Sequence, residues 1–288
     1  MNIIQVYKQF PDQEACIKHL EAVRWHGKPA CPYCKGQNAT ALAKEGRWHC
    51  NACNTSYSVT VGTIFHKTKV DLQKWFLAVS LVLNAKKGIS ARQLARDIEV
   101  NKNTGWFMLM RIRRAMIEQG DLLKGIVEAD ETYIGGKEKN KHSNKRGGGT
   151  QGRSTASKVI VAGVLERGGR IRARKVKDAK MKTLQPFIRQ LVRGDATLIT
   201  DEWISYNGLD KHFIHERINH SFGEYVRGNV HTNGIESFWA LLKRGIVGQY
   251  HKVSARHLDK YITEFAFRYN NRDVSAAFNL TLQKAVIR

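Results

Sequence analysis

The sequence has no apolar run long enough to cross a membrane. Its longest apolar segment, Trp75 to Leu83, includes Ser80 and is far shorter than the roughly 20 residues that a membrane-spanning helix needs. The segment from Met1 to Phe10 lacks the continuous apolar stretch of a secretory signal peptide, and no internal repeat or low-complexity tract is visible. We therefore expect a cytoplasmic protein that has no membrane partner.

Acidic residues are also scarce. The 288 residues include 25 Asp and Glu against 48 Lys and Arg, so the formal net charge is +23. A chain this basic attracts polyanions at favourable rates, and its binding to them should weaken steeply with salt. Charge alone also fits a ribosome-associated or merely basic protein, so it favours nucleic acid as the partner without identifying it.

Cysteines are few but regularly spaced. Four of the five form two Cys-x-x-Cys pairs, Cys31 with Cys34 and Cys50 with Cys53, separated by fifteen residues. Each pair can form a tight turn that aims two sulfurs at one point, and four sulfurs in a tetrahedron are a preferred site for structural Zn²⁺. Redox-active pairs would need a thioredoxin-like context, which this sequence lacks. We expect a zinc ribbon that binds DNA or protein, and Cys16 as an ordinary buried thiol.

Residues 70–118 carry the periodicity of helices. One helix is expected from Asp71 to Asn84, with Gly88 after it. Ser90-Ala-Arg-Gln93 has the form of a capping box that opens a second, short helix. A third helix follows a polar turn and runs to about Met116. The order of short helix, tight turn and longer helix predicts a helix-turn-helix, with a generic three-helix bundle as the alternative.

The third helix has the features of a recognition helix. Polar and aromatic side chains in its first turn suit base edges, and arginines further along suit phosphates. The candidates for DNA contact are Lys102, Asn103, Trp106, Arg111, Arg113 and Arg114. The apolar side of the helix would be Phe107, Met110, Ile112 and Met116.

Two strand-like runs further along the chain end on an aspartate. They are Ile126 to Asp130 and Thr197 to Asp201. Between them, Lys158 to Leu165 and Arg170 to Val176 predict a hairpin around Gly168-Gly169. Strands followed by helices in this order indicate an α/β domain.

Two helices accompany these strands. One is expected from Asp178, as its cap, to about Val192. The other carries Glu236 and Lys243, which are seven residues apart and so lie on nearly the same face, two turns apart. Its buried stripe would be Ile235, Phe238, Trp239, Leu242 and Ile246. A later helix is expected to pack on the sheet through Leu258, Ile262, Phe265, Ala266 and Tyr269.

Carboxylates at strand ends, joined by one from a helix, suit phosphodiester chemistry. The reaction needs a deprotonated water or 3′-hydroxyl and stabilisation of the leaving oxygen. Two Mg²⁺ ions about 4 Å apart supply both, held by hard oxygen ligands. Asp130, Asp201 and Glu236 are therefore candidate ligands for Mg²⁺ (or Mn²⁺). Lys243 and Arg244 are candidates for contact with DNA phosphate.

Asp130, Asp201 and Glu236, with thirty-four residues between the last two, resemble the DDE signature of transposases and retroviral integrases. Lys243 resembles the basic residue that often follows the glutamate by seven positions.

Longer segments carry a closer resemblance. Asp-Glu-Thr-Tyr-Ile-Gly-Gly-Lys at 130–137, Thr-Asp-Glu-Trp at 200–203 and the segment 231–244 are similar to a group of bacterial insertion-sequence DDE transposases. In that group an RNase H-like (ISXO-like) catalytic core follows an N-terminal zinc ribbon. The resemblance extends from about Cys31 to Arg272.

The resemblance implies several properties. These are binding of double-stranded DNA at terminal inverted repeats and target sites, strand cleavage and transfer with Mg²⁺ or Mn²⁺, and a homodimer or larger assembly on paired ends. In this group an Asn can stand at the third acidic position. Asn233 is thus an alternative to Glu236, or the N-cap of a capping box that includes Glu236. A non-catalytic DNA-binding regulator and an RNase H-like nuclease stay open as alternative functions.

The predicted architecture is multidomain. Residues 1–66 would form a lead-in helix and the zinc ribbon, 67–120 the α-helical helix-turn-helix, and 121–288 the RNase H-like α/β domain with a mixed sheet. The basic segment Lys137 to Ser157 is expected to be a loop that either orders on DNA or is merely solvated. His231 would either position water or DNA or serve as a structural histidine.

Overall fold

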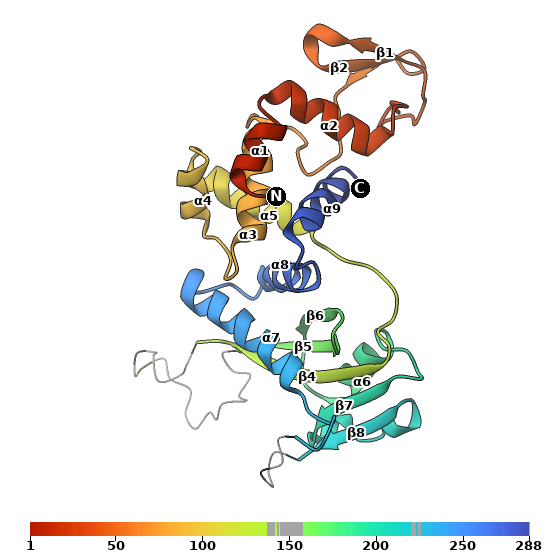
Figure 1. The fold of residues 1–288 in the computed structure, drawn as a ribbon, viewed down its shortest axis with the longest axis vertical. Helices are drawn as coiled ribbons and strands as arrows, with labels where there is room; N and C mark the ends of the chain where they lie inside the picture. The colour runs from red at the N-terminus through yellow and green to blue at the C-terminus, as the bar shows by residue number, and fades with distance from the viewer. Residues whose placement is uncertain (137–141, 143, 145–157, 220–222, 224–225, 288) are drawn as a thin grey trace. The chain divides into compact units, whose positions relative to one another are not determined.

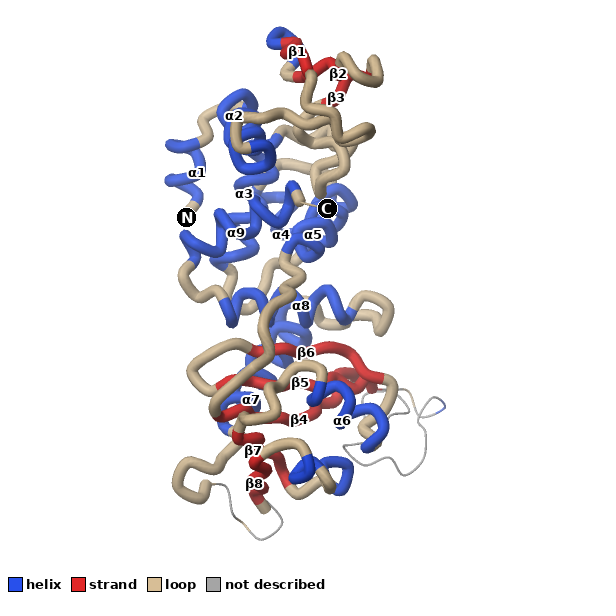
Figure 2. The backbone as a smooth tube through the Cα atoms, turned by 90° about the vertical axis from the view of Figure 1, so that its right-hand side faces the viewer, coloured by secondary structure: helices blue, strands red, loops and turns tan. Residues whose placement is uncertain are grey.

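The computed structural model describes residues 1–136, 142, 144, 158–219, 223 and 226–287, and the chain forms two compact units (Figures 1 and 2). Unit 1 combines Met1–Ile117 with Asn271–Arg288, and unit 2 is Glu118–Asn270. The predicted loop from Lys137 to Ser157 lies outside the described residues, except for 142 and 144. Within the described part of the chain, no helix has the length and apolar character to cross a membrane.

Unit 1 consists of helices and a small antiparallel sheet with strand order β1-β2-β3. Its helices are α1 (Ile3–Gln9), α2 (Gln13–Trp25), α3 (Leu72–Asn84), α4 (Ala91–Asp97), α5 (Lys102–Ala115) and α9 (Val274–Val286). Its strands are β1 (Ala39–Leu42), β2 (Arg47–Cys50) and β3 (Thr55–Tyr57), with a 3₁₀ turn at Ala43–Glu45. The lead-in helices and the three helices of the expected helix-turn-helix are therefore present.

The core of unit 1 joins segments from both ends of the chain. The Phe76 ring of α3 contacts Phe10 and Phe278, with centroid separations of 4.8 and 6.1 Å. Phe278 is fully buried and belongs to α9. The prediction that residues 271–288 belong to the RNase H-like domain is wrong, because α9 packs on α2, α3 and α5 in unit 1. The reason is that the apolar face of α9 completes the core around α3.

Unit 2 is built on a mixed sheet with strand order β6-β5-β4-β7-β8. Strands β4 (Ile126–Gly135), β5 (Lys158–Glu166) and β6 (Ile171–Val176) form an antiparallel meander, so the predicted hairpin is confirmed. Strands β7 (Thr197–Asp201) and β8 (Ile214–Ile218) continue the sheet in parallel with β4. The sheet is therefore mixed, as predicted.

Helices cover both faces of this sheet (Figures 1 and 2). Helix α6 (Met181–Arg189) packs on one face, and α7 (Asn233–Arg244) and α8 (Leu258–Asn270) pack on the other. The prediction that Asp178 caps α6 was wrong. The N-cap is Lys180, and Asp178 instead accepts a hydrogen bond from the Lys180 backbone N–H at 3.1 Å. The remaining short elements are 3₁₀ turns at Ile204–Tyr206 and Leu209–Lys211 and a π turn at Gly245–Gln249.

The alternation of side chains along β4 decides which of its residues meet α7. Val127 and Ala129 lie in the core beneath α6. Since successive side chains of a strand point to opposite faces, Glu128 and Asp130 face α7. The same alternation places Leu198 of β7 under α6 and Asp201 on the α7 side.

Candidate active site and zinc site

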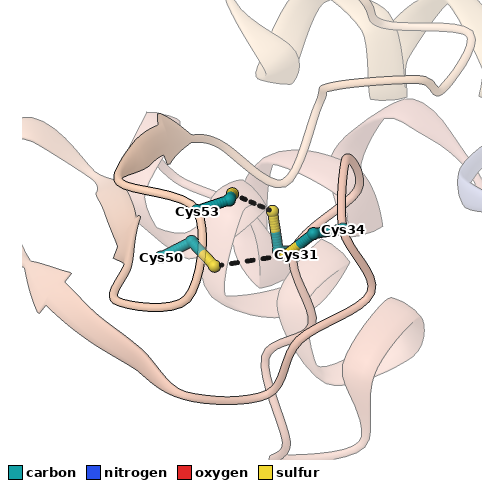
Figure 3. Close-up of side chains that lie close together, drawn as sticks. All are labelled: Cys31, Cys34, Cys50 and Cys53. Carbon is teal, nitrogen blue, oxygen red and sulfur yellow. Dashed lines mark hydrogen bonds between the residues drawn. The ribbon is translucent and has the colours of Figure 1, made fainter.

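The four paired cysteines of unit 1 converge as predicted (Figure 3). The Sγ atoms of Cys31 and Cys53 are 3.7 Å apart, and those of Cys34 and Cys50 are 3.5 Å apart. A zinc ion with four Zn–S bonds of about 2.3 Å has sulfurs about 3.8 Å apart along each tetrahedral edge. The observed separations fit that geometry. Among the described residues this is the one group of at least three His, Cys, Asp or Glu donors within 4.8 Å of one another.

In unit 2, Asp130 and Asp201 lie side by side at neighbouring strand positions. β4 and β7 pair in parallel, with Ile126 opposite Thr197 and Glu128 opposite Ile199. Continued by two residues, this register would place Asp130 of β4 opposite Asp201 of β7, and the Asp201 carboxylate is close enough to raise the pKa of Asp130. Adjacent strands are about 4.8 Å apart, so the sheet alone brings two carboxylates together.

Helix α7 brings the third carboxylate and a lysine to the same place. A cavity of about 540 Å³ is lined by Asp130, Asp201, Glu236 and Lys243 together. Glu236 and Lys243 lie on one face of α7, as their spacing predicted. The carboxylate oxygens around this cavity are spread more widely than the cysteine sulfurs. Among the described residues, no three of these carboxylates have oxygens within 4.8 Å of one another. The other lining residues are Glu131, Thr132, Tyr133, Lys158, Thr232, Trp239 and Ala240.

Asp130 has an environment that disfavours its negative charge. Burial raises its pKa to about 8, and the carboxylates of Glu131 and Asp201 contribute to the rise. The backbone N–H of Glu131 and the indole of Trp239 oppose it by hydrogen bonding. A divalent cation between these carboxylates would relieve their repulsion, and their oxygens are the hard donors that Mg²⁺ and Mn²⁺ prefer. The residues present therefore fit the expected ions.

Asp201 and Glu131 are both fixed by short contacts. An Asp201 oxygen, Oδ1, accepts a hydrogen bond from the Trp203 backbone N–H at 3.0 Å. Glu131 points to the opposite face of the sheet from Asp130, and its Oε2 accepts from the Tyr206 hydroxyl at 2.6 Å. Glu131 is buried yet reaches the cavity wall, and it was not among the predicted site residues.

The start of α7 separates the roles of Asn233 and Glu236. The N-cap is Thr232, and Asn233 is the first helical residue, with an exposed side chain. The Thr232 hydroxyl donates to Glu236 Oε1 at 2.8 Å. The expectation of Asn233 as N-cap is therefore wrong. Glu236, and not Asn233, lines the cavity.

An ion pair between a buried glutamate and a partly exposed arginine anchors this end of α7. Glu128 is fully buried; its Oε2 accepts from the Ile235 backbone N–H at 2.9 Å, and its Oε1 accepts from Arg167 Nη2 at 2.9 Å. Arg167 also donates to the carbonyl of His231 at 2.9 Å, and His231 Nδ1 lies 3.2 Å from the same Nη2. His231 thus belongs to a structural network. Glu128 and Arg167 were missed, because nothing in the local sequence distinguishes them from solvated charges.

The surroundings of Lys243 at the cavity wall shift its pKa in opposite directions. Burial lowers the pKa of its ammonium group, Asp130 raises it, and Lys158 lowers it again. Lys158, at the start of β5, was not among the predicted site residues. Arg244 is exposed, and its Nε donates to the Ala240 carbonyl at 3.1 Å.

The helix-turn-helix of unit 1 is packed closely. Ser90 caps α4 by accepting from the Gln93 N–H at 3.1 Å, and Asn101 caps α5 by accepting from the Asn103 N–H. A Cβ at Gly105 of α5 would lie 2.8 Å from the carbonyl oxygen of Ala91 in α4. The two helices can therefore touch only because position 105 is glycine.

The structure separates the predicted DNA contacts of α5 into two groups. Those with exposed side chains are Lys102, Asn103, Trp106 and Arg114. Arg111 instead donates to the carbonyls of Ile64 and His66, both at 2.7 Å. Arg113 is buried. These two arginines are thus engaged within unit 1. Phe107, expected on the apolar side, is 45% exposed, with the Arg111 guanidinium 4.1 Å from its ring centre.

Two segments of the chain match known protein families. Residues 122–270, more than half of the sequence, match the model of an ISXO2-like transposase domain, and residues 11–56 match a transposase zinc-ribbon domain. An uncharacterized protein in transposable element ISH50 of Halobacterium salinarum is 30% identical over 273 residues, which is 91% of this chain and 92% of that protein. An uncharacterized transposase-like protein of Haemophilus influenzae is 32% identical over 109 residues, covering 38% of this chain and 87% of that protein.

Likeness to solved structures is weak. A pre-cleavage Mos1 transpososome and a Mos1 transposase paired-end complex with the left transposon end align at TM-scores of 0.28 and 0.30, each at 12% identity. The alignments cover 72% and 73% of this chain and 78% of each Mos1 chain, and scores this low add nothing to the assignment. The family matches decide it. The chain belongs to the family of ISXO2-like transposases, and it carries the zinc-ribbon domain of such transposases.

Proposed function

We propose that this transposase is catalytically active, binding the terminal inverted repeats of its insertion sequence and cutting and joining DNA strands with Mg²⁺ or Mn²⁺. The observation that carries the proposal is the cavity of unit 2. Asp130, Asp201 and Glu236 come from two strands and a helix, yet their carboxylates line one cavity together with Lys243. A solvated strand-end aspartate has no need of such neighbours.

The three carboxylates would hold the metal ions. Two Mg²⁺ ions bound there would activate the attacking hydroxyl and stabilise the charge that develops on the leaving oxygen. Lys243 and Lys158 would contact phosphate oxygens at the same wall, since an ammonium group is a point charge suited to phosphate. Arg244, exposed one residue further, would contact the DNA backbone.

DNA recognition is proposed for unit 1. Lys102, Asn103 and Trp106 are exposed on the first turns of α5, which is the part of a recognition helix that reaches base edges. Arg114 would contact phosphate. Because each end of an insertion sequence carries one repeat, we propose that two or more copies of the chain assemble on paired ends.

The test uses full-length, zinc-loaded protein and labelled DNA that carries the ends flanking its own gene. With Mg²⁺ or Mn²⁺, we expect both nicked and joined products. Asp201→Asn should abolish cleavage while leaving end binding intact, and Asp130→Ala should also abolish cleavage. Asp195→Asn is the matched control, because this aspartate is exposed and pairs with Arg193 outside the cavity.

The outcomes separate the competing functions. Cleavage without joined product would indicate an RNase H-like nuclease. Tight binding of the ends without any cleavage, in either metal, would indicate a DNA-binding regulator. Undiminished cleavage by Asp201→Asn would show that the assigned carboxylates are not the catalytic ones.

A further inference from the structure

Trp239 makes a contact that the proposed reaction does not explain. Its indole Nε1 donates a hydrogen bond to Asp130 Oδ2 at 2.9 Å, and its side chain is only 4% exposed. Trp239 lies on α7 one turn after Glu236. It therefore links the carboxylate of β4 directly to the helix that carries the third carboxylate.

The sheet is shaped to receive this indole. Gly163 of β5 is the cross-strand partner of Asp130. A Cβ at Gly163 would lie 2.7 Å from Cη2 and 2.8 Å from Cζ2 of Trp239. The ring thus rests on a bare backbone next to Asp130, and only glycine leaves room for it. An apolar side chain would fill the same space, but only a tryptophan also brings an N–H to the carboxylate.

We propose that Trp239 is a positioning residue for metal binding. By engaging Oδ2, its N–H restricts the rotation of the Asp130 carboxyl group that would hold the ions. Its ring, seated on Gly163, sets the spacing between α7 and β4, and hence between Glu236 and Asp130. The inference rests on the proposed role of Asp130 as a metal ligand. Groups that orient ligands in this way typically change metal affinity by about 10–100-fold when removed.

Trp239→Phe separates the hydrogen bond from the packing, because it keeps an aromatic ring and removes the N–H. Binding of Mn²⁺ and of Mg²⁺ to the zinc-loaded, full-length protein is measured by isothermal titration calorimetry. We expect the variant to bind either ion about 10-fold more weakly. Its affinity for the DNA ends in the absence of metal should match that of the wild type. Strand cleavage should fall at low Mn²⁺ and recover at high Mn²⁺.

Trp48→Phe is the matched control. The Trp48 indole also donates to a carboxylate, Glu21 Oε1, at 2.8 Å, but in unit 1. This control should leave the affinity for Mn²⁺ and Mg²⁺ unchanged. If Trp239→Phe binds both ions as tightly as the wild type, the positioning role is wrong.

A second variant tests the assumption beneath the inference. Asp130→Asn should weaken metal binding more than Trp239→Phe does. If Asp130→Asn binds metal normally, Asp130 is not a ligand, and both the proposed site and the role of Trp239 fail. If Asp130→Asn loses metal while Trp239→Phe keeps it, the site stands and the role of Trp239 alone is overturned. If cleavage by Trp239→Phe does not recover at high Mn²⁺, the positioning role is also contradicted. Extra metal can compensate for a weaker metal affinity but not for a misfolded protein.

Discussion

At the scale of single residues, the site depends on glycines, which have no side chain, as much as on charged residues. Gly163 leaves room for the Trp239 ring. Gly234 does the same for Glu128, whose Oε2 would lie 2.8 Å from a Cβ at that position. Without that space the Glu128 carboxylate would not reach the backbone N–H of Ile235 at the start of α7. Two glycines thus let a helix approach the carboxylates of β4.

Gly163→Ala should destabilise unit 2 even though it adds only one methyl group. The new Cβ would overlap the Trp239 ring, and overpacking of this kind typically costs about 1–3 kcal/mol. Urea unfolding of unit 2 measures the loss. Gly248→Ala is the control, because its Cβ would meet no described atom within 4 Å. Equal stability of the two variants would mean that the ring moves aside without cost.

His215 should make unit 2 sensitive to acid. Its Nε2 lies 2.9 Å from the Thr200 hydroxyl, and burial lowers its pKa to about 4, with Arg217 adding to the effect. The unfolded chain, with a histidine pKa near 6.5, therefore binds more protons than the folded one between about pH 4 and 6.5. Stability from neutral His215 is present above that range and is lost as the pH falls through it.

Urea unfolding at pH 7 and pH 5 checks this expectation. The loss of stability at pH 5 should be smaller in His215→Gln than in the wild type. His251→Gln, which changes an exposed histidine, should retain the wild-type loss. An identical loss in both variants would assign the acid sensitivity to other groups.

The site residues that could be predicted are those that a short stretch of sequence identifies. The Cys-x-x-Cys spacing identifies the four cysteines, and the position at the end of a strand-like run identifies the two aspartates. Gly163 and Arg111 could not be found in this way. Arg111 donates to carbonyls 45 and 47 positions away, and any residue supplies a carbonyl. Such contacts leave no pattern in the sequence around either partner.

At the scale of elements, the contact between α4 and α5 is the tightest constraint on the helix-turn-helix. A Cβ at Gly105 would lie 2.8 Å from the Ala91 carbonyl oxygen and 3.1 Å from Ala95 Cβ. Both neighbours belong to α4 or its backbone, so neither can rotate away as a flexible side chain would. The close approach of the two helices therefore depends on a glycine near the start of α5.

Gly105→Ala should lower both stability and DNA binding. Alanine normally stabilises a helix interior by about 1 kcal/mol relative to glycine. Here we expect a net loss of about 1–3 kcal/mol, because the helices must separate. Unfolding of unit 1 and binding to the end DNA measure the two effects. Lys102→Ala, at an exposed position, should weaken binding without changing stability, and a stabilised Gly105→Ala would contradict the prediction.

The predicted start of a helix agrees with the structure for α4, where a side-chain cap is present, and differs from it for α6, which has no side-chain cap. Ser90 caps α4 as expected. Asp178 was expected to cap α6, but the helix begins three residues later, after Lys180. Helix α9 was not predicted as a separate helix. Its packing in unit 1 could not be predicted either, because the apolar face of a helix does not by itself indicate which core it packs against. The stripe of α8 was placed correctly on the sheet, where Leu258, Ile262 and Phe265 are buried.

At the scale of the whole molecule, unit 2 is inserted between the two segments of unit 1. The chain leaves unit 1 after Ile117 and returns to it at Asn271. The returning helix supplies Phe278, which is fully buried against Phe10 and Phe76. The stability of unit 1 therefore depends on residues that follow unit 2 in the sequence.

Phe278→Ala should destabilise unit 1 by about 3–5 kcal/mol, as other buried Phe→Ala changes do. Amide hydrogen exchange measures each unit separately, and we expect α3 to lose protection while β4 and β7 keep theirs. Phe187→Ala, which changes a residue of α6 in the core between that helix and the sheet, should give the converse pattern. Loss of protection in β4 with Phe278→Ala would show that the units do not unfold independently.

This inserted arrangement has a consequence for synthesis on the ribosome. Domains generally fold as their sequence emerges, N-terminal parts first. Here the helices of the expected DNA-binding unit emerge early, but the core around Phe76 is incomplete until α9 has been made. Unit 2, whose residues are contiguous, is fully synthesised by then. A nascent chain has therefore synthesised all of unit 2, with its proposed active site, before the core of unit 1 is complete. We expect a translation product that stops before α9 to bind the DNA ends weakly.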